Sequence, residues 1–291
     1  MSILIIGNKG SFSSKISDLI SRKYKIEFFQ IEKDIEIEKS ISQIKKKLTL
    51  NNLNFLIYLG GETRFNNLMK RFNEDFLKKI FLLSKEYNLN LIYLSSLAVF
   101  GIPREESINC YSKRKPFNLY GKTKNSADIF IKENLGKTFV FSLMPASIIS
   151  ESEHNFYVKL KKIMTNNIVK KIFYILCPGG QFSFCSYINI ADEIINIIES
   201  INNSNIKNYL SKNKFQEIIV SYGKSIREIY YEANNYYPIF DIPSININFV
   251  KIIFFFLNPR LLLRMIFLFS VIDYKNKYKF LIKSKKNKNE K

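Results

Sequence analysis

The segments LIYLSSLAVFG (residues 91–101) and PFNLYGKTK (residues 116–124) decide the fold and the candidate site of this chain. The first is apolar and predicts a buried strand that ends at two serine hydroxyls. Because side chains alternate along a strand, Ser96 rather than its neighbour is expected to face the site. The second segment predicts a helix start with Tyr120 and Lys124 on one face. A hydroxyl, a phenol and an ammonium that converge at a strand end can transfer a proton.

Apolar runs alternate with amphipathic helical patterns from residue 2 to residue 145. The runs lie at residues 2–6, 24–31, 54–61, 89–96 and 137–145. Such alternation is typical of an α/β protein with a Rossmann-like, doubly wound parallel sheet. We therefore expect a dinucleotide-binding domain over residues 1–145. Residues 146–248 alternate less regularly and predict a mixed segment that returns to the sheet and forms a small substrate lobe.

The first apolar run ends in a glycine turn, GNKGSFS, that leads into a helical pattern. Gly7 can make the tight turn and Gly10 can let the backbone approach a pyrophosphate. The backbone of Lys9, Ser11 and Phe12 completes a cradle in which N–H groups and the helix dipole favour an anion.

Together these segments resemble the extended short-chain dehydrogenase/reductase family, in the branch that modifies nucleotide sugars. The family carries Ser-Ser-x-x-Val-Tyr-Gly followed by Tyr-x-x-x-Lys. Here Phe100 replaces the tyrosine of the first motif, Ser13 replaces the third glycine of the turn, and Met144 replaces an arginine before a proline. The serine predicts a helix that packs a little further from its strand, and the methionine predicts that the polar role of that arginine is absent.

The resemblance implies further site residues. Leu59, Gly60 and Gly61 end the third run, at the place that lies beside the ribose and nicotinamide of the cofactor in the family. Asn73 matches an asparagine that lies near the family's active site. Lys124 matches the lysine that holds the nicotinamide ribose, in addition to its effect on Tyr120.

The preference between NADP and NAD depends on the end of the second strand, where an acid usually binds the ribose hydroxyls. That place falls on Gln30, which is neutral, and Lys9 could bind the extra phosphate of NADP. NADP is therefore slightly favoured over NAD. In the alternative, Glu32 or Asp34 binds the ribose and Lys9 is solvated.

A free tyrosine has a pKa near 10, and lowering it to 7 takes roughly 4 kcal/mol of preferential stabilisation of the phenolate. Lys124 and an oxidised nicotinamide are expected to supply this, while Ser96 orients the reacting oxygen. Leu97 and Ala98 stand where family dehydratases carry Asp-Glu, which argues against dehydration. Reduction of a keto nucleotide-diphosphate sugar is the first expectation and 4-epimerisation the second. A catalytically inactive dinucleotide-binding sensor or scaffold stays open.

The chain is strongly basic, with 45 Lys and Arg against 25 Asp and Glu in 291 residues. A diphosphate substrate suits this charge, although a general bias toward lysine explains it equally well, and no specific nucleic acid is expected. Residues 249–291 combine an apolar segment with a polybasic tail. They predict peripheral contact of a cytoplasmic protein with the inner face of an anionic membrane, or else a docking helix or a homodimer surface. The single histidine and three cysteines predict no metal site.

Overall fold

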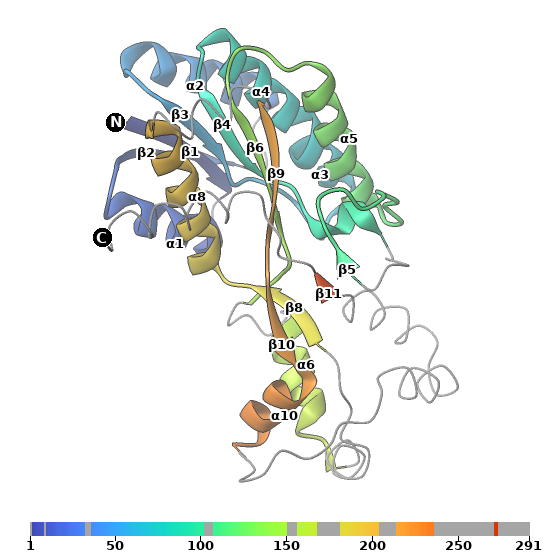
Figure 1. The fold of residues 1–291 in the computed structure, drawn as a ribbon. Coiled ribbons are helices and arrows are strands. Elements are labelled where there is room, and N and C mark those ends of the chain that lie inside the picture. Colours follow the sequence, from blue (N-terminus) through green and yellow to red (C-terminus); the bar gives the residue numbers. More distant parts are fainter. Residues whose placement is uncertain are drawn as a thin grey trace.

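A computed structural model describes residues 2–8, 10–32, 36–101, 107–149, 156–167, 181–203, 214–235 and 271–272. Its centre is a six-stranded parallel sheet in the order β2-β1-β3-β4-β6-β9 (Figure 1). The strands are β1 (Ser2–Asn8), β2 (Lys25–Ile31), β3 (Phe55–Tyr58), β4 (Asn90–Leu94), β6 (Val140–Pro145) and β9 (Phe215–Val220). The predicted doubly wound parallel sheet is confirmed.

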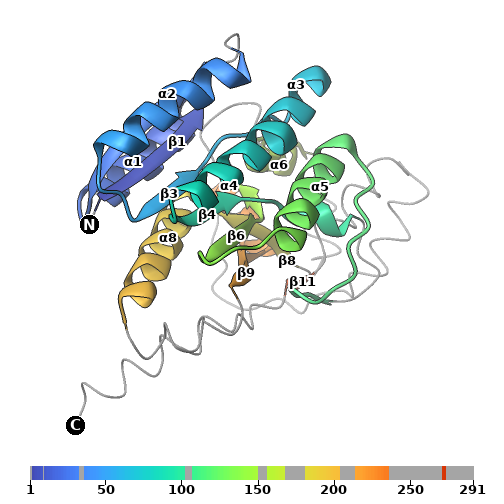
Figure 2. The ribbon, with the colours of Figure 1, turned by 90° about the horizontal axis from the view of Figure 1, so that it is seen from above.

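Helices cover both faces of this sheet (Figures 1 and 2). One face carries α1 (Ser11–Ser21) and α8 (Tyr187–Asn202), and the other carries α2 (Ile37–Leu50), α4 (Phe76–Glu86) and α5 (Leu119–Glu133). Alternation along β1 explains the two layers of core. Ile3 and Ile5 pack in the α1/α8 layer, whereas Leu4 and Ile6 pack in the opposite layer.

Open parallel sheets bind ligands in a crevice outside the carboxyl ends of the strands, at the point where the strand order reverses. The chain passes from β1 to β2 on one side and then returns to place β3 on the other, so these two strands form the topological switch point at which such sheets bind ligands. At their carboxyl ends the Asn8 side-chain amide donates to the carbonyl of Gly61 at 2.7 Å. The glycine turn after β1 therefore lies beside the glycine pair after β3.

Helix α1 approaches the end of β1 very closely. A Cβ built on Gly7 would lie 2.7 Å from both Cβ and Oγ of Ser13. Ser13 itself is buried. The serine in place of the third glycine is therefore accommodated because Gly7 has no side chain, and the helix remains in contact with the strand.

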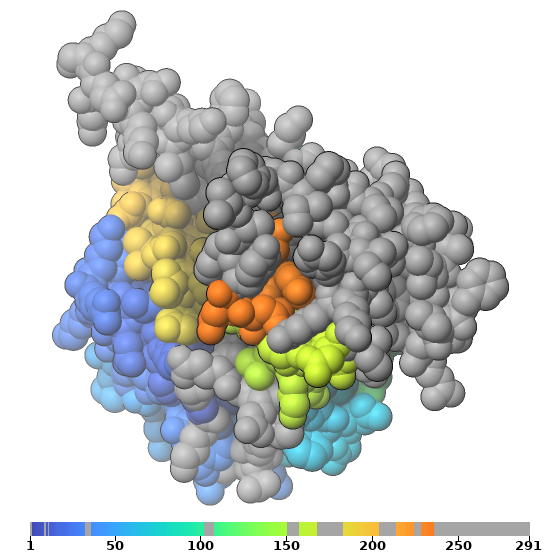
Figure 3. All heavy atoms as spheres, turned by 90° about the horizontal axis from the view of Figure 1, so that it is seen from below, coloured from blue at the N-terminus to red at the C-terminus, as the bar shows by residue number. Residues whose placement is uncertain are grey.

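A second, smaller sheet packs below the carboxyl ends of β6 and β9 in Figure 1, with strand order β10-β8-β7. It contains β7 (Ser147–Ile148), β8 (Gln181–Cys185) and β10 (Tyr222–Ser225). Helices α6 (Phe156–Met164) and α10 (Ile226–Asn234) pack together in this lobe, as Figure 3 shows from below. Tyr157 and Phe184 meet edge to face in its small core.

Most of residues 249–291 lies outside the described residues. Val271–Ile272 form β11, which pairs in parallel with β5 (Ser107–Ile108). Across the described ranges, no helix is both long and apolar enough to cross a membrane. Contact of this segment with a membrane stays a prediction.

The contact between β1 and α1 generates a test of packing. Gly7→Ala should lower the free energy of unfolding by about 1–3 kcal/mol, because the added methyl group overpacks the buried Ser13. Urea denaturation measures this difference. Adding Ser13→Gly should recover part of the loss by removing the clashing atoms. Equal stability of Gly7→Ala and the wild-type protein would contradict the close approach.

Candidate active site

Helix α5 begins directly beside the end of β4. Asn118 caps it, and its side-chain oxygen accepts from the Gly121 amide at 2.8 Å. A Cβ on Gly121 would lie 2.4 Å from the carbonyl oxygen of Ala98, in the 3-10 turn Leu97–Phe100 that follows β4. Glycine at this position therefore lets the first turn of α5 touch that turn, which places Tyr120 next to Ser96.

The two serines after β4 face different environments, as strand alternation predicted. The Ser96 hydroxyl accepts from the Ala98 amide at 3.2 Å and lies near enough to the Tyr120 phenol to lower its pKa. The Ser95 hydroxyl donates to the buried Asp128 carboxylate at 2.7 Å, away from the site. Ser96 is thus the serine that is available to a substrate oxygen.

Tyr120 and Ser96 line one cavity of about 360 Å³, between the large sheet and the small lobe. The rest of its wall includes the apolar residues Leu97, Ala98, Ile108, Pro145, Ala146 and Ile148. Three further hydroxyl-bearing residues line it: Thr63, Ser147 and Ser183. No sequence pattern indicated these three, because isolated serines and threonines in loops and short strands have no distinctive spacing.

Lys124 is almost fully buried, one helical turn after Tyr120. Its ammonium donates to the carbonyl of Leu94 at 2.7 Å, and a Cβ on Gly61 would lie 3.3 Å from it. Lys124 therefore reaches from α5 to the end of β3. Burial lowers the pKa of Lys124 to about 8, against an opposing effect of the nearby Asp128 carboxylate.

The pKa of Tyr120 is raised, mainly because burial disfavours the phenolate, while the hydrogen bond with Ser96 acts in the opposite direction. The expected lowering by Lys124 is therefore not a property of the protein's own side chains. The Lys124 ammonium instead donates to the Leu94 carbonyl. At neutral pH Tyr120 is a protonated phenol, and it can donate a proton to a substrate oxygen.

Asn73 lies in a π-helical turn, Arg71–Asp75, and is fully buried. Its side-chain oxygen accepts from the Glu62 amide at 2.9 Å, and its amide donates to the Glu62 carbonyl at 2.8 Å and to Thr123 Oγ1 at 3.3 Å. These bonds clamp the segment after β3 to α5. Asn73, predicted as catalytic, thus has contacts that support a positioning role.

The residues at the switch point have contacts compatible with the predicted dinucleotide site. Gln30 is exposed and pairs in register with Gly7, as its predicted role beside the ribose requires. A Cβ on Gly10 would meet no atom within 4 Å, so the turn leaves space above the start of α1. In the described chain, the Asn8 Oδ1 atom is buried without a hydrogen-bond partner at this edge.

The other predicted cofactor residues also surround this edge. Leu59 is buried and its amide donates to the Ile6 carbonyl at 2.8 Å. The Tyr58 ring leaves no room for a side chain at Gly60, since an added Cβ would lie 2.7 Å from it. The backbone of Ser11 and Phe12 forms the first turn of α1. Lys9 lies outside the described residues.

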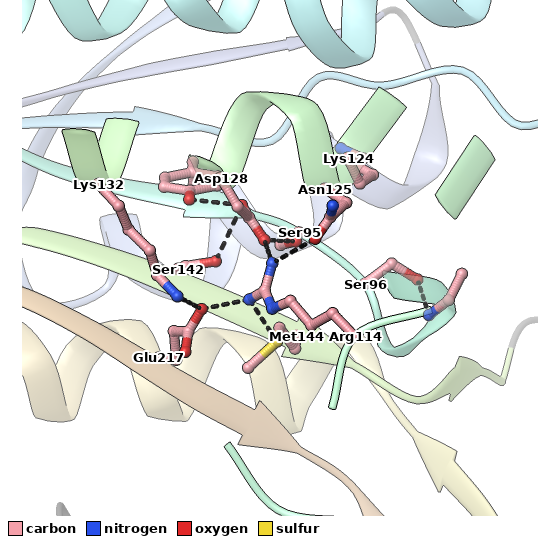
Figure 4. Close-up of polar contacts among 12 residues, drawn as sticks. Ser95, Ser96, Arg114, Lys124, Asn125, Asp128, Lys132, Ser142, Met144 and Glu217 are labelled. Carbon is pink, nitrogen blue, oxygen red and sulfur yellow. Dashed lines mark hydrogen bonds and ion pairs between the residues drawn. The ribbon is translucent and has the colours of Figure 1, made fainter. Parts of the chain in front are cut away.

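The sequence analysis also missed Arg114. Its guanidinium bonds Asp128 on α5 and Glu217 on β9, and it lies 3.8 Å from the sulfur of Met144 (Figure 4). Burial opposes the charge of Arg114, but the two carboxylates outweigh it and raise the pKa of the guanidinium. An arginine in a polar loop gives no sequence signal for such a contact. The one sequence feature that points to this contact is Met144, which stands where the family resemblance predicts an arginine.

Comparison with known proteins agrees with this geometry. Residues 1–173 match the family described as the RmlD substrate binding domain. No curated protein matches the chain. The fold is that of a Rossmann-type, NAD(P)-binding protein. The chain belongs to the RmlD substrate binding domain family, within the extended short-chain dehydrogenases/reductases.

Solved structures share the fold at low sequence identity. dTDP-4-dehydrorhamnose reductase from Bacillus anthracis, in complex with NADP, has a TM-score of 0.57 and 18% identity, over 84% of this chain and 83% of that one. ADP-L-glycero-D-manno-heptose-6-epimerase from Helicobacter pylori has a TM-score of 0.60 and 14% identity, over 84% and 85%. WbmG from Bordetella bronchiseptica, in complex with NAD and UDP, has a TM-score of 0.56 and 14% identity, over 84% and 81%.

The lowered pKa of Lys124 predicts a dependence of stability on pH. Below about pH 8 the folded protein bears the full cost of the buried charge. Between pH 8 and the unfolded value of 10.5, the folded state has released the proton and the unfolded state has not, so stability rises with pH. From pH 7.5 to 9.5 we expect the free energy of unfolding to gain about 1–2 kcal/mol relative to Lys124→Met.

Urea denaturation at both pH values measures this gain. Lys122→Met is the matched control, because Lys122 lies on the same helix and is exposed. It should retain the wild-type pH dependence. If Lys124→Met and the wild-type protein changed equally with pH, the buried ammonium would not have the lowered pKa.

Proposed function

We propose that this protein is an NAD(P)-dependent enzyme that reduces the keto group of a nucleotide-diphosphate sugar. The observation that carries the proposal is that Tyr120 and Ser96 line one cavity, while Lys124, one helical turn after Tyr120, reaches Gly61 after β3. Family membership supports the class. A dTDP-4-dehydrorhamnose reductase of similar fold in complex with NADP, and WbmG in complex with NAD and UDP, support the cofactor and the substrate class.

Each residue has a role that its contacts support. Tyr120 donates a proton to the carbonyl oxygen, since its raised pKa keeps it protonated at neutral pH. Ser96 holds that oxygen through its hydroxyl, because it lines the same cavity as Tyr120. Lys124 binds the nicotinamide ribose, and the segments of Gly7, Gly10 and Gly60–Gly61 line the crevice. The cofactor, when bound, supplies the hydride.

Epimerisation through a transient keto intermediate is the second candidate. The heptose epimerase of similar fold favours it. In that reaction Tyr120 would first have to accept a proton, which its raised pKa disfavours. Leu97 and Ala98 are apolar and line the cavity, so neither candidate reaction includes elimination of water.

An inactive dinucleotide-binding protein is the third candidate, suggested by the replacements at Ser13, Gln30 and Met144. Ser13 is accommodated by Gly7, and Arg114 brings a guanidinium to Met144, so two of these replacements are compensated. Homodimer formation and contact of residues 249–291 with an anionic membrane also remain predictions.

Replacement of the phenol tests the proposed reaction. Tyr120→Phe should lower kcat/KM for the keto sugar by at least about 100-fold, because it removes the proton donor. Binding of NADPH, followed by its fluorescence, should change less than about threefold. Mass analysis of products separates the candidates, since reduction adds two hydrogens and epimerisation adds none. Undiminished turnover by Tyr120→Phe would refute the assignment, and binding without turnover by the wild-type protein would favour the inactive candidate.

The NADP preference is tested at Lys9. Wild-type protein should bind NADPH more tightly than NADH, and Lys9→Ala should weaken NADPH binding by about tenfold while leaving NADH nearly unchanged. Titration of cofactor fluorescence gives both constants. Gln30→Asp is expected to shift the preference toward NADH, because a carboxylate binds ribose hydroxyls and repels a phosphate. Equal losses for both cofactors in Lys9→Ala would contradict the assignment.

A further inference from the structure

Arg114 joins three parts of the molecule through one guanidinium (Figure 4). Nη1 donates to Asp128 Oδ2 at 2.7 Å and to Asn125 Oδ1 at 3.1 Å, both on α5. Nη2 forms an ion pair with Glu217 on β9. Arg114 itself belongs to the loop between β5 and α5. The catalytic helix, the sheet and this loop therefore share one set of charges.

Asp128 is the residue through which Arg114 contacts the core side of α5. Its side chain is fully buried, and its oxygens accept from the Tyr93 hydroxyl at 2.6 Å and the Ser95 hydroxyl at 2.7 Å. Both donors belong to β4 or its end. Among the ion pairs of the described residues, Asp128 is paired with Arg114. Removing that cation would leave the buried carboxylate without its ion-pair partner, which is unfavourable even with the Lys124 ammonium nearby.

The side chain of Met144, on β6, contacts the Arg114 guanidinium. Met144 is fully buried, and its sulfur lies 3.8 Å from Nη2 of Arg114. A longer side chain at this position would therefore bring its end group to Asp128 or Glu217. This is the position where the family resemblance predicts an arginine. Arg114 in the loop therefore supplies the guanidinium that β6 lacks at position 144.

The loop that carries Arg114 also packs against the segment after β4. The guanidinium lies over the Phe100 ring, 5.9 Å from its centroid. Gly101 has a positive φ of 70°, and a Cβ there would lie 1.8 Å from the Lys115 carbonyl oxygen. Ile108, just before the loop, lines the cavity that contains Tyr120. Arg114 therefore lies in a loop that follows a wall residue of the cavity and precedes the start of α5.

We propose that Arg114 is a positioning residue: it supplies from the loop the guanidinium that β6 lacks at Met144, and through Asp128 it holds α5 where Tyr120 and Ser96 share the cavity. The inference rests on the proposed function for the role of Tyr120 in turnover. It assigns to Arg114 no contact with substrate.

Exchange of the guanidinium between loop and strand tests this proposal. Arg114→Met should lower kcat by at least about tenfold with KM for the keto sugar within threefold, because a displaced helix loses alignment more than affinity. The kcat of Arg114→Lys should lie between those of the wild-type protein and Arg114→Met. One ammonium cannot bond both carboxylates as the planar guanidinium does. The double variant Arg114→Met/Met144→Arg should recover kcat to within about fivefold of wild type.

Lys132→Met is the matched control. Lys132 lies on α5 and pairs with the same Glu217 at 2.7 Å, yet it makes no ion pair with Asp128 in the described structure. Its kcat should stay within about threefold of wild type. All rates are measured on folded protein, well below the melting midpoint of each variant. A lowered midpoint with unchanged kcat in Arg114→Met would show a purely structural role and overturn the proposal.

Two further measurements keep the inference testable if Arg114→Met does not fold. Arg114→Lys and the double variant are then compared with each other, and a double variant that folds but turns over no faster than Arg114→Lys contradicts the exchange. Thermal midpoints need no substrate. Recovery of the midpoint in the double variant would support the exchange even if the wild-type protein turned over no nucleotide sugar, so the two hypotheses fail separately.

Discussion

The structure depends on one buried carboxylate. Asp128 lies on α5 without exposure to solvent and binds hydroxyls at β4 and the guanidinium of Arg114. Burying such a charge is costly unless its partners are complete. The carboxylate therefore fixes α5 against the sheet in one position. Tyr120 and Lys124 lie two turns and one turn before it, so their approach to the end of β4 follows from this constraint.

Close backbone contacts complete the arrangement at the strand ends. Gly7 lets α1 contact β1, and Gly121 lets α5 contact the turn after β4. Asn73 uses both polar atoms of its side chain to hold the segment after β3. These contacts fix the backbone at the ends of β1, β3 and β4, near the proposed cofactor crevice and the cavity of Tyr120 and Ser96. Neither could move far without a change in backbone packing.

Local patterns predicted much of this. The alternation of strands and helices follows from hydrophobic periodicity, and the shared cavity of Ser96 and Tyr120 follows from strand alternation and helical spacing. Arg114 could not be predicted, because its partners Asp128 and Glu217 lie 14 and 103 residues away. Ser147 and Ser183 could not be assigned to the cavity either, since the small lobe brings together short strands with weak patterns. The pKa of Tyr120 depends on burial, which the spacing of residues does not report.

The central claim is that crevice and cavity form one active site. A crystal structure of the protein with NADP+ and UDP tests it most directly. We predict that the pyrophosphate of the cofactor lies on the turn between Gly7 and Gly10. The nicotinamide should then enter the cavity beside Tyr120 and Ser96, with the Lys124 ammonium on its ribose. A cofactor bound elsewhere, or a nicotinamide directed away from Tyr120, would contradict the account.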